Sequence, residues 1–556
     1  MESAWKINSM REKCKIAFLI DNDDCNHHYL EILEKIMASN SFQDPVFISD
    51  KVYLSKIEYL YSFKRLKSLP RNLLLKLIAY FENFFLKRDL KFKIPSKDRN
   101  LKKYNLKILR VCSIKSPKNV RRFSENDISV IKKEKFDVII RCGNGILKGE
   151  ILESAKHGIF SFHHGDNREF RGMPSGFWEV YNNALSTGFI IQKLTEDLDR
   201  GYVLARGNIP TASYWQRNNA LITYKSINSM INILKQLSGG ELPKIEKDQE
   251  YSEKIYNLPS TKILIKYILK QLYLLIIRLK KRLLGVSLKW EVRIIKSETV
   301  ENLHLQPYFS LKHPSGASLA DPFLFQQDGE EFCFVEEIGS SKKGVISTFK
   351  IEESGPKYLG RILEEDFHLS FPYIFEYENE IYMCPETASI QEIRLYKCIE
   401  FPCKWVFEKT LVSGVDAVDS MIICKEDQWF LMTTYCNSNS NDHNSELNIL
   451  IPQKNNPLSE TWFPVGHNPV VFDSRSARNG GLARIGDKLL RVGQIHAKGF
   501  YGYGINLNEI IKIEKNIYIE KKIDTITPNK IEGIKGIHHL SKTKRLIAYD
   551  VSFESS

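Results

Sequence analysis

Two adjacent histidines and nearby carboxylates form the densest group of reactive side chains in the first half of the chain. His163, His164 and Asp166 follow Gly158-Ile-Phe-Ser-Phe, an alternating run typical of a strand, and Asp199 comes later in the same stretch. Polar groups at strand ends are where α/β proteins usually hold their chemistry. An imidazole can stabilise the negative oxygen of an attacked acyl carbon, and a carboxylate can orient it or accept a proton. This stretch is therefore the best candidate for a site in the first half of the chain.

The same stretch resembles the formyltransferase family, which moves a formyl group from 10-formyltetrahydrofolate to an amine. The resemblance rests on four segments in the family's order: Ser161-Phe162-His163, Arg171-Gly172, Thr187-Gly188 and Leu198-Asp199-Arg200-Gly201. It implies His163 and Asp199 as the catalytic pair and 10-formyltetrahydrofolate as cofactor. The chain departs from the family at Ser161, where the family has asparagine, and in the loop His164-Gly165-Asp166.

The other predicted residues of this first site have supporting roles. Ser161 would donate a hydrogen bond to the reacting oxygen, while His164, Asp166 and Arg171 would shape the loop that holds the substrate. Asn144 lies in a Gly-Asn-Gly turn after a buried strand and is a further substrate contact. Two other interpretations stay open. The polar residues could only cap a strand and fix a loop, or His and Asp could bind a metal, although no further ligand cluster lies nearby in the sequence and no metal is expected.

The second half of the chain contains a repeat of paired apolar strands joined by short charged turns. Its units begin at Asp321, Phe371, Asp419, Asn479 and Lys535, which are 50, 48, 60 and 56 residues apart. This spacing is typical of the blades of a β-propeller, so the repeat predicts five blades.

This half resembles the N-terminal domain of plant glucosamine inositolphosphorylceramide transferases and, more distantly, five-bladed glycosidases. The motifs that carry the resemblance are Ala320-Asp321-Pro322-Phe323, Phe367 to Pro372, Pro385-Glu386-Thr387, Phe401 to Trp405 and Val418-Asp419-Ser420. Residues that open the innermost strands line the central funnel of a propeller. The predicted sugar-binding residues are therefore Asp321, His368, Glu386, Asp419 and Arg478. Two of these carboxylates could act as acid and base on a glycosidic bond, or the aspartates could only bind backbone amides and fix the blade starts.

The net charge of +13 is concentrated in two segments. Lys51 to Arg110 holds 17 basic and 4 acidic residues, and Thr261 to Arg293 holds 9 basic and 1 acidic, so the remainder is net acidic. This distribution does not favour nucleic-acid binding or transfer-RNA formylation. Both segments contain an amphipathic helix, at 69–93 and 261–284. Such basic helices could lie on an anionic membrane surface, or the second could be a connector buried between domains with solvated lysines.

The sequence thus predicts an α/β plus all-β chain: a doubly wound formyltransferase-like domain at 1–240, a linker and basic amphipathic helix at 241–298, and a five-bladed propeller at 299–556. We expect a transferase that moves a formyl group to an amino-sugar nucleotide or sugar-lipid intermediate in surface-glycan biosynthesis. The alternative is a glycosyltransferase or glycoside-processing enzyme with its site in the propeller and a degenerate first domain. A membrane-peripheral glycan-binding scaffold is a third reading. Scattered cysteines and a polar start favour the cytoplasm, with a peripheral place on the inner face of the plasma membrane as an option.

Overall fold

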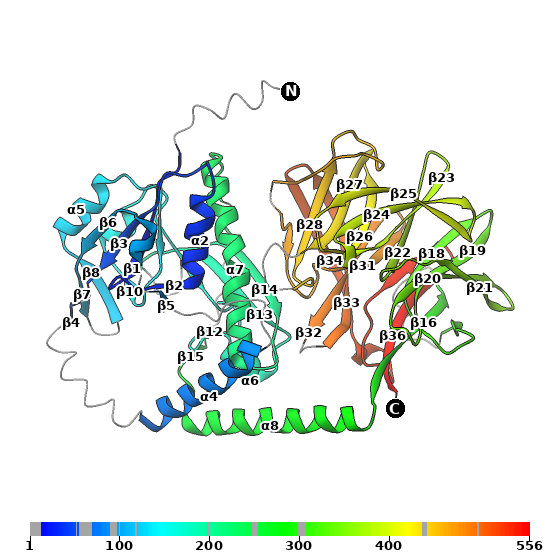
Figure 1. Ribbon diagram of the computed structural model, residues 1–556, viewed down its shortest axis with the longest axis horizontal. Coiled ribbons are helices and arrows are strands. Elements are labelled where there is room, and N and C mark those ends of the chain that lie inside the picture. The colour runs from blue at the N-terminus through cyan, green and yellow to red at the C-terminus, as the bar shows by residue number, and fades with distance from the viewer. Residues whose placement is uncertain are drawn as a thin grey trace.

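The computed structural model describes residues 13–51, 53–54, 69–88, 97–98, 101–116, 119–196, 201–243, 245–246, 254–297, 307–435, 442–466, 468–497 and 500–555. It is a mixed α/β protein with many β-sheets. One α/β layer forms from the first half of the chain and a group of antiparallel sheets from the second, and they lie side by side (Figure 1).

The first half is built on a seven-stranded sheet in the order β14-β13-β11-β9-β1-β3-β6. The strands are β1 (Ile16–Asp21), β3 (Val46–Asp50), β6 (Ile108–Val111), β9 (Val138–Arg141), β11 (Ile159–His163), β13 (Ser186–Lys193) and β14 (Tyr202–Pro210). The first five are parallel, and β13 and β14 are added antiparallel at one edge. The near-continuous apolar sequences of β1 and β9 fit this arrangement, because a parallel sheet is buried on both faces.

Helices cover both faces of this sheet, so the expected α/β layer with helices on two sides is present. On one face α2 (His27–Met37) and α7 (Trp215–Ser238) pack together over a core that includes Phe18 and Ile140. On the other face α5 (Glu125–Lys133) covers Leu19 and Ile139, and Ser124 caps its first turn by accepting from the Asp127 amide. Alternate residues of each strand therefore feed two separate cores.

Short elements complete the first half. They are β2 (Cys25–Asn26), β4 (Tyr53–Leu54), β5 (Lys97–Asp98), β7 (Ser113–Ser116), β8 (Val120–Phe123), β10 (Ile146–Leu147), β12 (Arg171–Gly172), β15 (Ile255–Tyr256) and α6 (Phe177–Asn182).

The second half contains five antiparallel sheets of four strands or slightly more. The first is β18 (Ser318–Gln327), β19 (Glu330–Ile338), β20 (Gly344–Glu352) and β21 (Gly355–Leu363). The second is β22 (Ser370–Tyr377), β23 (Glu380–Glu386), β24 (Glu392–Glu400) and β25 (Lys404–Ser413). The third is β26 (Ala417–Lys425), β27 (Gln428–Tyr435), β28 (Glu446–Pro452) and β29 (Trp462–Pro464), with β30 (Val471–Phe472) beside β28. The fourth is β31 (Asn479–Ile485), β32 (Lys488–Ala497), β33 (Phe500–Glu514) and β34 (Ile517–Ile526).

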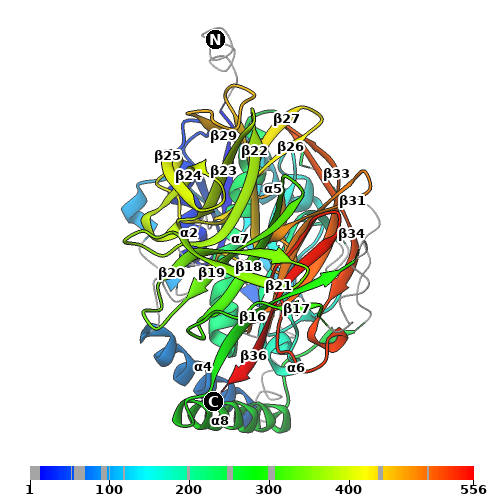
Figure 2. The ribbon, with the colours of Figure 1, turned by 90° about the vertical axis from the view of Figure 1, so that its right-hand side faces the viewer.

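The fifth sheet joins the two ends of this region. It runs β17-β16-β36-β35, so β35 (Leu540–Lys542) and β36 (Leu546–Ser555) pair with β16 (Ser287–Lys296) and β17 (Phe309–Ser310). Strand β16 precedes residue 299, so the sheet region includes part of the segment expected as a connector. The first strands β18, β22, β26, β31 and β35 contact one another in turn, and β35 returns to β18. This ring of sheets is propeller-like (Figures 1 and 2).

Three of the inner strands begin with the same local distortion. Asp321, Phe371 and Asp419 each adopt a left-handed backbone conformation, with φ of 50°, 48° and 49°, and each lies in a bulge of its strand pairing. A bulge redirects the side chains beside it. The repeated motifs found in the sequence therefore correspond to a repeated backbone feature at the centre of the ring.

Two further helices run along one edge of the molecule. Helix α4 (Leu69–Arg88) packs against α7, and α8 (Thr261–Leu283) passes beneath the first half towards β16 (Figure 1). Of the described side chains of α8, only Leu264 and Tyr267 are buried. The expectation of a connector buried between domains is therefore wrong for α8, which is largely exposed.

Candidate functional site

Asp321 lies at the centre of the ring and faces a buried histidine. Its Oδ1 is 3.2 Å from His538 Nε2, and the other ring nitrogen of His538 is 2.8 Å from Asp550 Oδ2. Burial opposes the charge on Asp321, but His538 outweighs it and lowers the pKa of this carboxyl. Burial likewise opposes the charge on His538, but Asp550 and Asp321 raise the pKa of His538 to about 10. The pair is therefore an ionised carboxylate held beside an imidazolium.

Asp550 holds this arrangement in place. Its carboxylate accepts from the backbone amides of His538, His539 and Asp321, at 3.0, 2.9 and 3.1 Å. The second oxygen of Asp321 accepts from the Phe371 amide at 3.3 Å, which links the first sheet to the second. Asp321 thus binds a backbone amide of the next sheet through Oδ2, while its Oδ1 lies against His538.

The ligand atoms of Asp321, His538 and Asp550 lie within 4.8 Å of one another, close enough for a metal ion. The hydrogen bonds already accepted by the two carboxylates account for this grouping without one.

Arg478 brings two further predicted carboxylates together. It donates to Asp419 Oδ2 from Nε at 2.5 Å, and its terminal nitrogen is 3.6 Å from Glu386 Oε2. Burial, reinforced by the Asp419 carboxylate, raises the pKa of Glu386 well above its ordinary value. Gln494 adds a hydrogen bond to Asp419 at 2.8 Å. The site therefore pairs a carboxyl that stays protonated, on Glu386, with a carboxylate that stays ionised, on Asp321.

His368 lies in the same cluster and is partly exposed. Its Nδ1 accepts from the Gly344 amide at 2.9 Å, which fixes the proton on Nε2, and Nε2 is 3.1 Å from Glu336 Oε1. The hydrogen bond with Glu336 raises the pKa of His368, and burial raises the pKa of Glu336. Asp321 influences both groups electrostatically. The structure thus brings together the five predicted residues of the second half: Asp321, His368, Glu386, Asp419 and Arg478.

Aromatic rings complete one side of this cluster. The Tyr501 ring lies 5.2 Å from the Arg478 guanidinium and 5.1 Å from the His538 ring, and the Trp290 ring lies 4.2 Å from the His538 ring at a tilt of 50°. Aromatic walls with a few convergent polar groups are typical of small-molecule sites. Sequence reasoning missed several members of the site: Trp290, Glu336, Gln494, Tyr501, His538 and Asp550. A signal existed for His538, since the fifth repeat unit contains the pair His538-His539.

The first half has a separate cavity of about 740 Å³ at the ends of β9 and β11. Ser161 and His163 both line it, together with Arg71, Asn119, Arg141 and Gln192. Arg141 is 3.3 Å from Asp21 Oδ1, so part of its charge is already neutralised. The cavity is large enough for a drug-sized ligand.

The other predicted residues of the first half that the structure describes do not line this cavity. His164 packs against Phe162 and its Nε2 is 3.3 Å from Ser226 Oγ, and burial with the adjacent His163 lowers its pKa to about 4. Asp166 forms ion pairs with Arg168 and Arg206 at 2.9 and 2.6 Å, which fix the loop as expected.

The three remaining predicted residues of the first half are Arg171, Asn144 and Asp199. Arg171 lies in β12, whose backbone pairs with β15. Asn144 is exposed, and its backbone rather than its side chain is held, since its amide donates to Asp21 at 2.8 Å. Asp199 lies outside the described residues.

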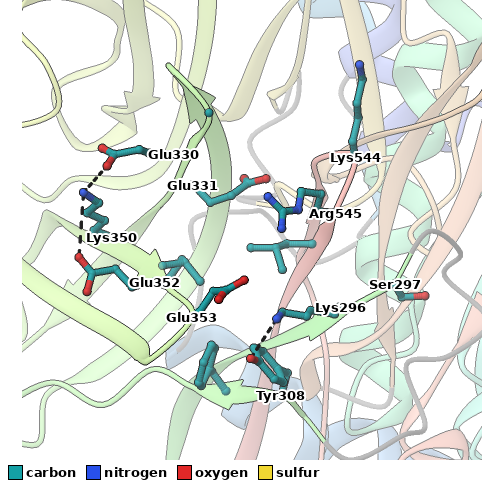
Figure 3. Close-up of a pocket in the computed structure, with 14 residues that line it drawn as sticks. Lys296, Ser297, Tyr308, Glu330, Glu331, Lys350, Glu352, Glu353, Lys544 and Arg545 are labelled. Carbon is teal, nitrogen blue, oxygen red and sulfur yellow. Dashed lines mark hydrogen bonds and ion pairs between the residues drawn. The ribbon is translucent and has the colours of Figure 1, made fainter.

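A further cavity of about 760 Å³ lies between the first and fifth sheets (Figure 3). Part of its charged lining is paired: Lys350 is 2.5 Å from Glu330 and 4.0 Å from Glu352, and Lys296 donates to the Tyr308 hydroxyl at 2.9 Å. None of the predicted site residues lines it.

Sequence similarity to known proteins is found mainly in the second half of the chain. Residues 309–545 match the family model for the N-terminal region of glucosamine inositolphosphorylceramide transferase 1. Proteins named glucosamine inositolphosphorylceramide transferase 1 are 35% identical over 212 residues in Oryza sativa subsp. japonica and 36% identical over 211 residues in Arabidopsis thaliana. Each match covers 37% of this chain, and the chain spans only 28% and 27% of those relatives.

Solved structures resemble each half at low identity. The catalytic domain of a GH62 α-L-arabinofuranosidase from Coprinopsis cinerea is 10% identical and covers 48% of this chain and 97% of its own, with a TM-score of 0.32. Glycinamide ribonucleotide transformylase 1 from Symbiobacterium toebii is 12% identical and covers 42% of this chain and 93% of its own, with a TM-score of 0.26. Those scores are too low to support a functional argument. The sequence relatives are named as transferases.

Proposed function

We propose that this chain is a transferase that processes sugars and that its sugar site is the centre of the ring of five sheets. The observation that carries the proposal is that two carboxyls of one cluster have pKa values shifted in opposite directions. The pKa of Glu386 is raised and that of Asp321 is lowered. Such a pair can divide the roles of acid and base. This favours the alternative of a site in the propeller over formyl transfer as the main activity.

The two carboxyls have distinct roles in a glycosyl transfer. Glu386 donates its proton to the departing glycosidic oxygen as the bond from that oxygen to the anomeric carbon breaks. Asp321 accepts the proton of the incoming hydroxyl as the new carbon–oxygen bond forms. Arg478 and His538 orient the two carboxyls and do not transfer protons themselves. His368 and Asp419 supply polar groups for the sugar hydroxyls.

The substrate class follows from the relatives' name, which joins an amino sugar to a lipid. We infer a glucosamine-type sugar and a sugar-lipid acceptor, with an amino-sugar nucleotide as the donor to test first. This assignment concerns a chain that matches only part of those relatives, so it is a proposal about this site and not about their whole activity.

The test uses two glycosides of the same amino sugar, one with an aryl and one with an alkyl leaving group. Glu386→Gln should lower turnover of the alkyl glycoside by about 10²–10⁴-fold, because that leaving group needs a proton. It should affect the aryl glycoside much less. Asp321→Asn should lower both.

The matched controls are Glu426→Gln and Asp487→Asn, at exposed turn positions, which should leave turnover unchanged. Mass spectrometry of transfer from a uridine-diphosphate amino sugar to an inositol-containing lipid extends the assay to the proposed donor. Unchanged turnover in Asp321→Asn would exclude this site.

A second candidate function belongs to the cavity of the first half, because Ser161 and His163 line it together. We infer that it binds a 10-formyltetrahydrofolate-like ligand, which would supply the formyl group when bound, with His163 stabilising the oxyanion and Asp199 taking the amine proton. Calorimetry with a 10-formyltetrahydrofolate analogue tests it. Binding lost in His163→Ala and retained in Asp321→Asn would support it, and no binding at millimolar analogue would exclude it. Turnover lost in Asp199→Asn would mark this half as catalytic.

A further inference from the structure

Helices α4 and α8 expose an extended apolar surface, which we call the two-helix edge. On α4 the exposed side chains are Leu73, Leu77, Tyr80, Phe81, Phe84 and Phe85. On α8 they are Ile265, Leu269, Leu272, Tyr273, Leu275, Ile276, Leu279 and Leu283. Scattered exposed apolar residues are normal, but fourteen exposed apolar side chains on two helices that contact each other mark an interaction site.

The two helices are held to the protein by only part of their surface. Leu264 and Tyr267 of α8 pack in a core with Ile78 of α4 and with Phe177. The Tyr267 hydroxyl donates to Glu82 at 2.6 Å, and Lys270 donates to the carbonyl of Val180 at 2.6 Å. These contacts anchor the N-terminal half of α8 and leave its C-terminal half exposed.

The exposed residues form a stripe along each helix. Positions 265, 269, 272, 276, 279 and 283 recur at intervals of three and four, as do 73, 77, 80 and 84 on α4, with 81 and 85 adjacent to the last two. Both helices lie at the same edge of the molecule, with α4 below the first half and α8 extending from there towards the second half (Figures 1 and 2). The most exposed positions include Tyr273 and Ile276, at 64% and 63% of their full surface.

The charge of the two-helix edge indicates which kind of partner it would bind. Helix α8 carries seven basic residues and no acidic ones: Lys262, Lys266, Lys270, Arg278, Lys280, Lys281 and Arg282. A second copy of the same helix would bring like charges together, which opposes self-association through this face. An anionic surface would instead be attracted.

We propose that the two-helix edge lies in the interface of an anionic lipid bilayer. Aromatic and aliphatic side chains would enter the boundary between headgroups and acyl chains while the basic residues meet lipid phosphates and carboxylates. None of the helices in the described part of the chain is long and apolar enough to cross a bilayer. Basic amphipathic helices of this kind lie in the plane of the interface. This inference does not depend on which half of the chain is catalytic.

Vesicle sedimentation of the full chain tests the proposal. We expect binding to phosphatidylcholine vesicles that contain about one third phosphatidylserine, weaker binding to phosphatidylcholine alone, and a decrease with added salt. Leu272→Ser/Ile276→Ser should weaken binding to both kinds of vesicle by at least about tenfold, because the apolar contact is lost. Lys280→Gln/Arg282→Gln should weaken binding to the anionic vesicles alone, by about fivefold for each residue.

The matched control is Ile519→Ser/Ile523→Ser, which changes two exposed isoleucines on β34 and should bind as the unchanged chain does. Asp321→Asn should also bind fully, which separates this test from that of the sugar site. Failure to sediment with anionic vesicles would overturn the proposal. So would a dimer in light scattering that Leu272→Ser/Ile276→Ser dissociates, since a second copy would then cover this edge.

Discussion

Lys225 and Glu446 form a fully buried ion pair between the two halves of the chain. The Lys225 ammonium on α7 is 2.6 Å from Glu446 Oε1, and both side chains are inaccessible to solvent. Asp442 lies 3.3 Å from the same ammonium, and its neighbour Asn444 is 3.5 Å from Arg478 of the sugar site. The helix that covers the α/β sheet thus contacts the rim of the ring of sheets.

Removing Lys225 should destabilise this junction. In Lys225→Met two buried carboxylates lose their counter-ion, so we expect the free energy of unfolding to fall by about 3–5 kcal/mol. Denaturant titration measures this change. The double variant Lys225→Met/Glu446→Leu should recover part of the loss, because fewer charges are left unpaired. No difference between Lys225→Met and the unchanged chain would show that the pair does not stabilise the junction.

Turnover at the sugar site should depend on pH in a bell-shaped manner. Asp321 must be ionised and Glu386 protonated, so the lowered pKa of Asp321 sets the acid limb and the raised pKa of Glu386 sets the alkaline limb. In Glu386→Gln the alkaline limb should disappear, because glutamine cannot lose that proton. A profile of kcat/KM against pH checks this. An alkaline limb that persists in Glu386→Gln would assign the acid role to another group.

His28 should make the α/β half sensitive to acid. Burial, followed by the nearby His164, lowers its pKa to about 3 from an ordinary value near 6.5. At acid pH the unfolded chain therefore binds a proton on His28 that the folded chain does not bind. The free energy of unfolding is at its highest above pH 6.5 and falls as the pH drops towards 3.

Between pH 6.5 and pH 5, the free energy of unfolding should fall by about 2 kcal/mol less in His28→Phe than in the unchanged chain. Thermal melts at the two pH values measure the difference. Tyr29→Phe, at the ring that stacks 4.0 Å from His28, is the control and should keep the acid sensitivity. Equal acid sensitivity in His28→Phe would contradict this assignment.

The sequence predicted the sheets and the residues that open the inner strands of the ring. It predicted fewer of the residues that contact them. Strands with period-two or continuous apolar patterns, and a repeat of about 50 residues, are local signals, so the parallel sheet and the five sheets could be expected. Asp321 and Asp419 were found because each opens a repeat unit.

The missed residues come from long-range geometry. Asp550 is 229 residues from Asp321 and lies mid-strand on β36, where its sequence neighbours give no sign that it supports a site. Trp290 belongs to β16, whose pairing with the last strand of the chain could not be read from either segment alone. In the first half, His164 and Asp166 looked like site residues because they follow His163, yet successive residues at a strand end point in different directions.

Tyr501 gives a final prediction for the sugar site. Its ring lies 5.2 Å from the Arg478 guanidinium, within the range of a cation–π contact. Tyr501→Phe should therefore keep sugar affinity within about twofold, since phenylalanine also attracts a cation to its face. Tyr501→Ala should weaken binding by about tenfold, because an aromatic wall of the site is lost and Arg478 is less restrained. Calorimetric titration of an amino-sugar glycoside measures both. If Tyr501→Phe lost as much affinity as Tyr501→Ala, the hydroxyl would be the group that contacts the sugar.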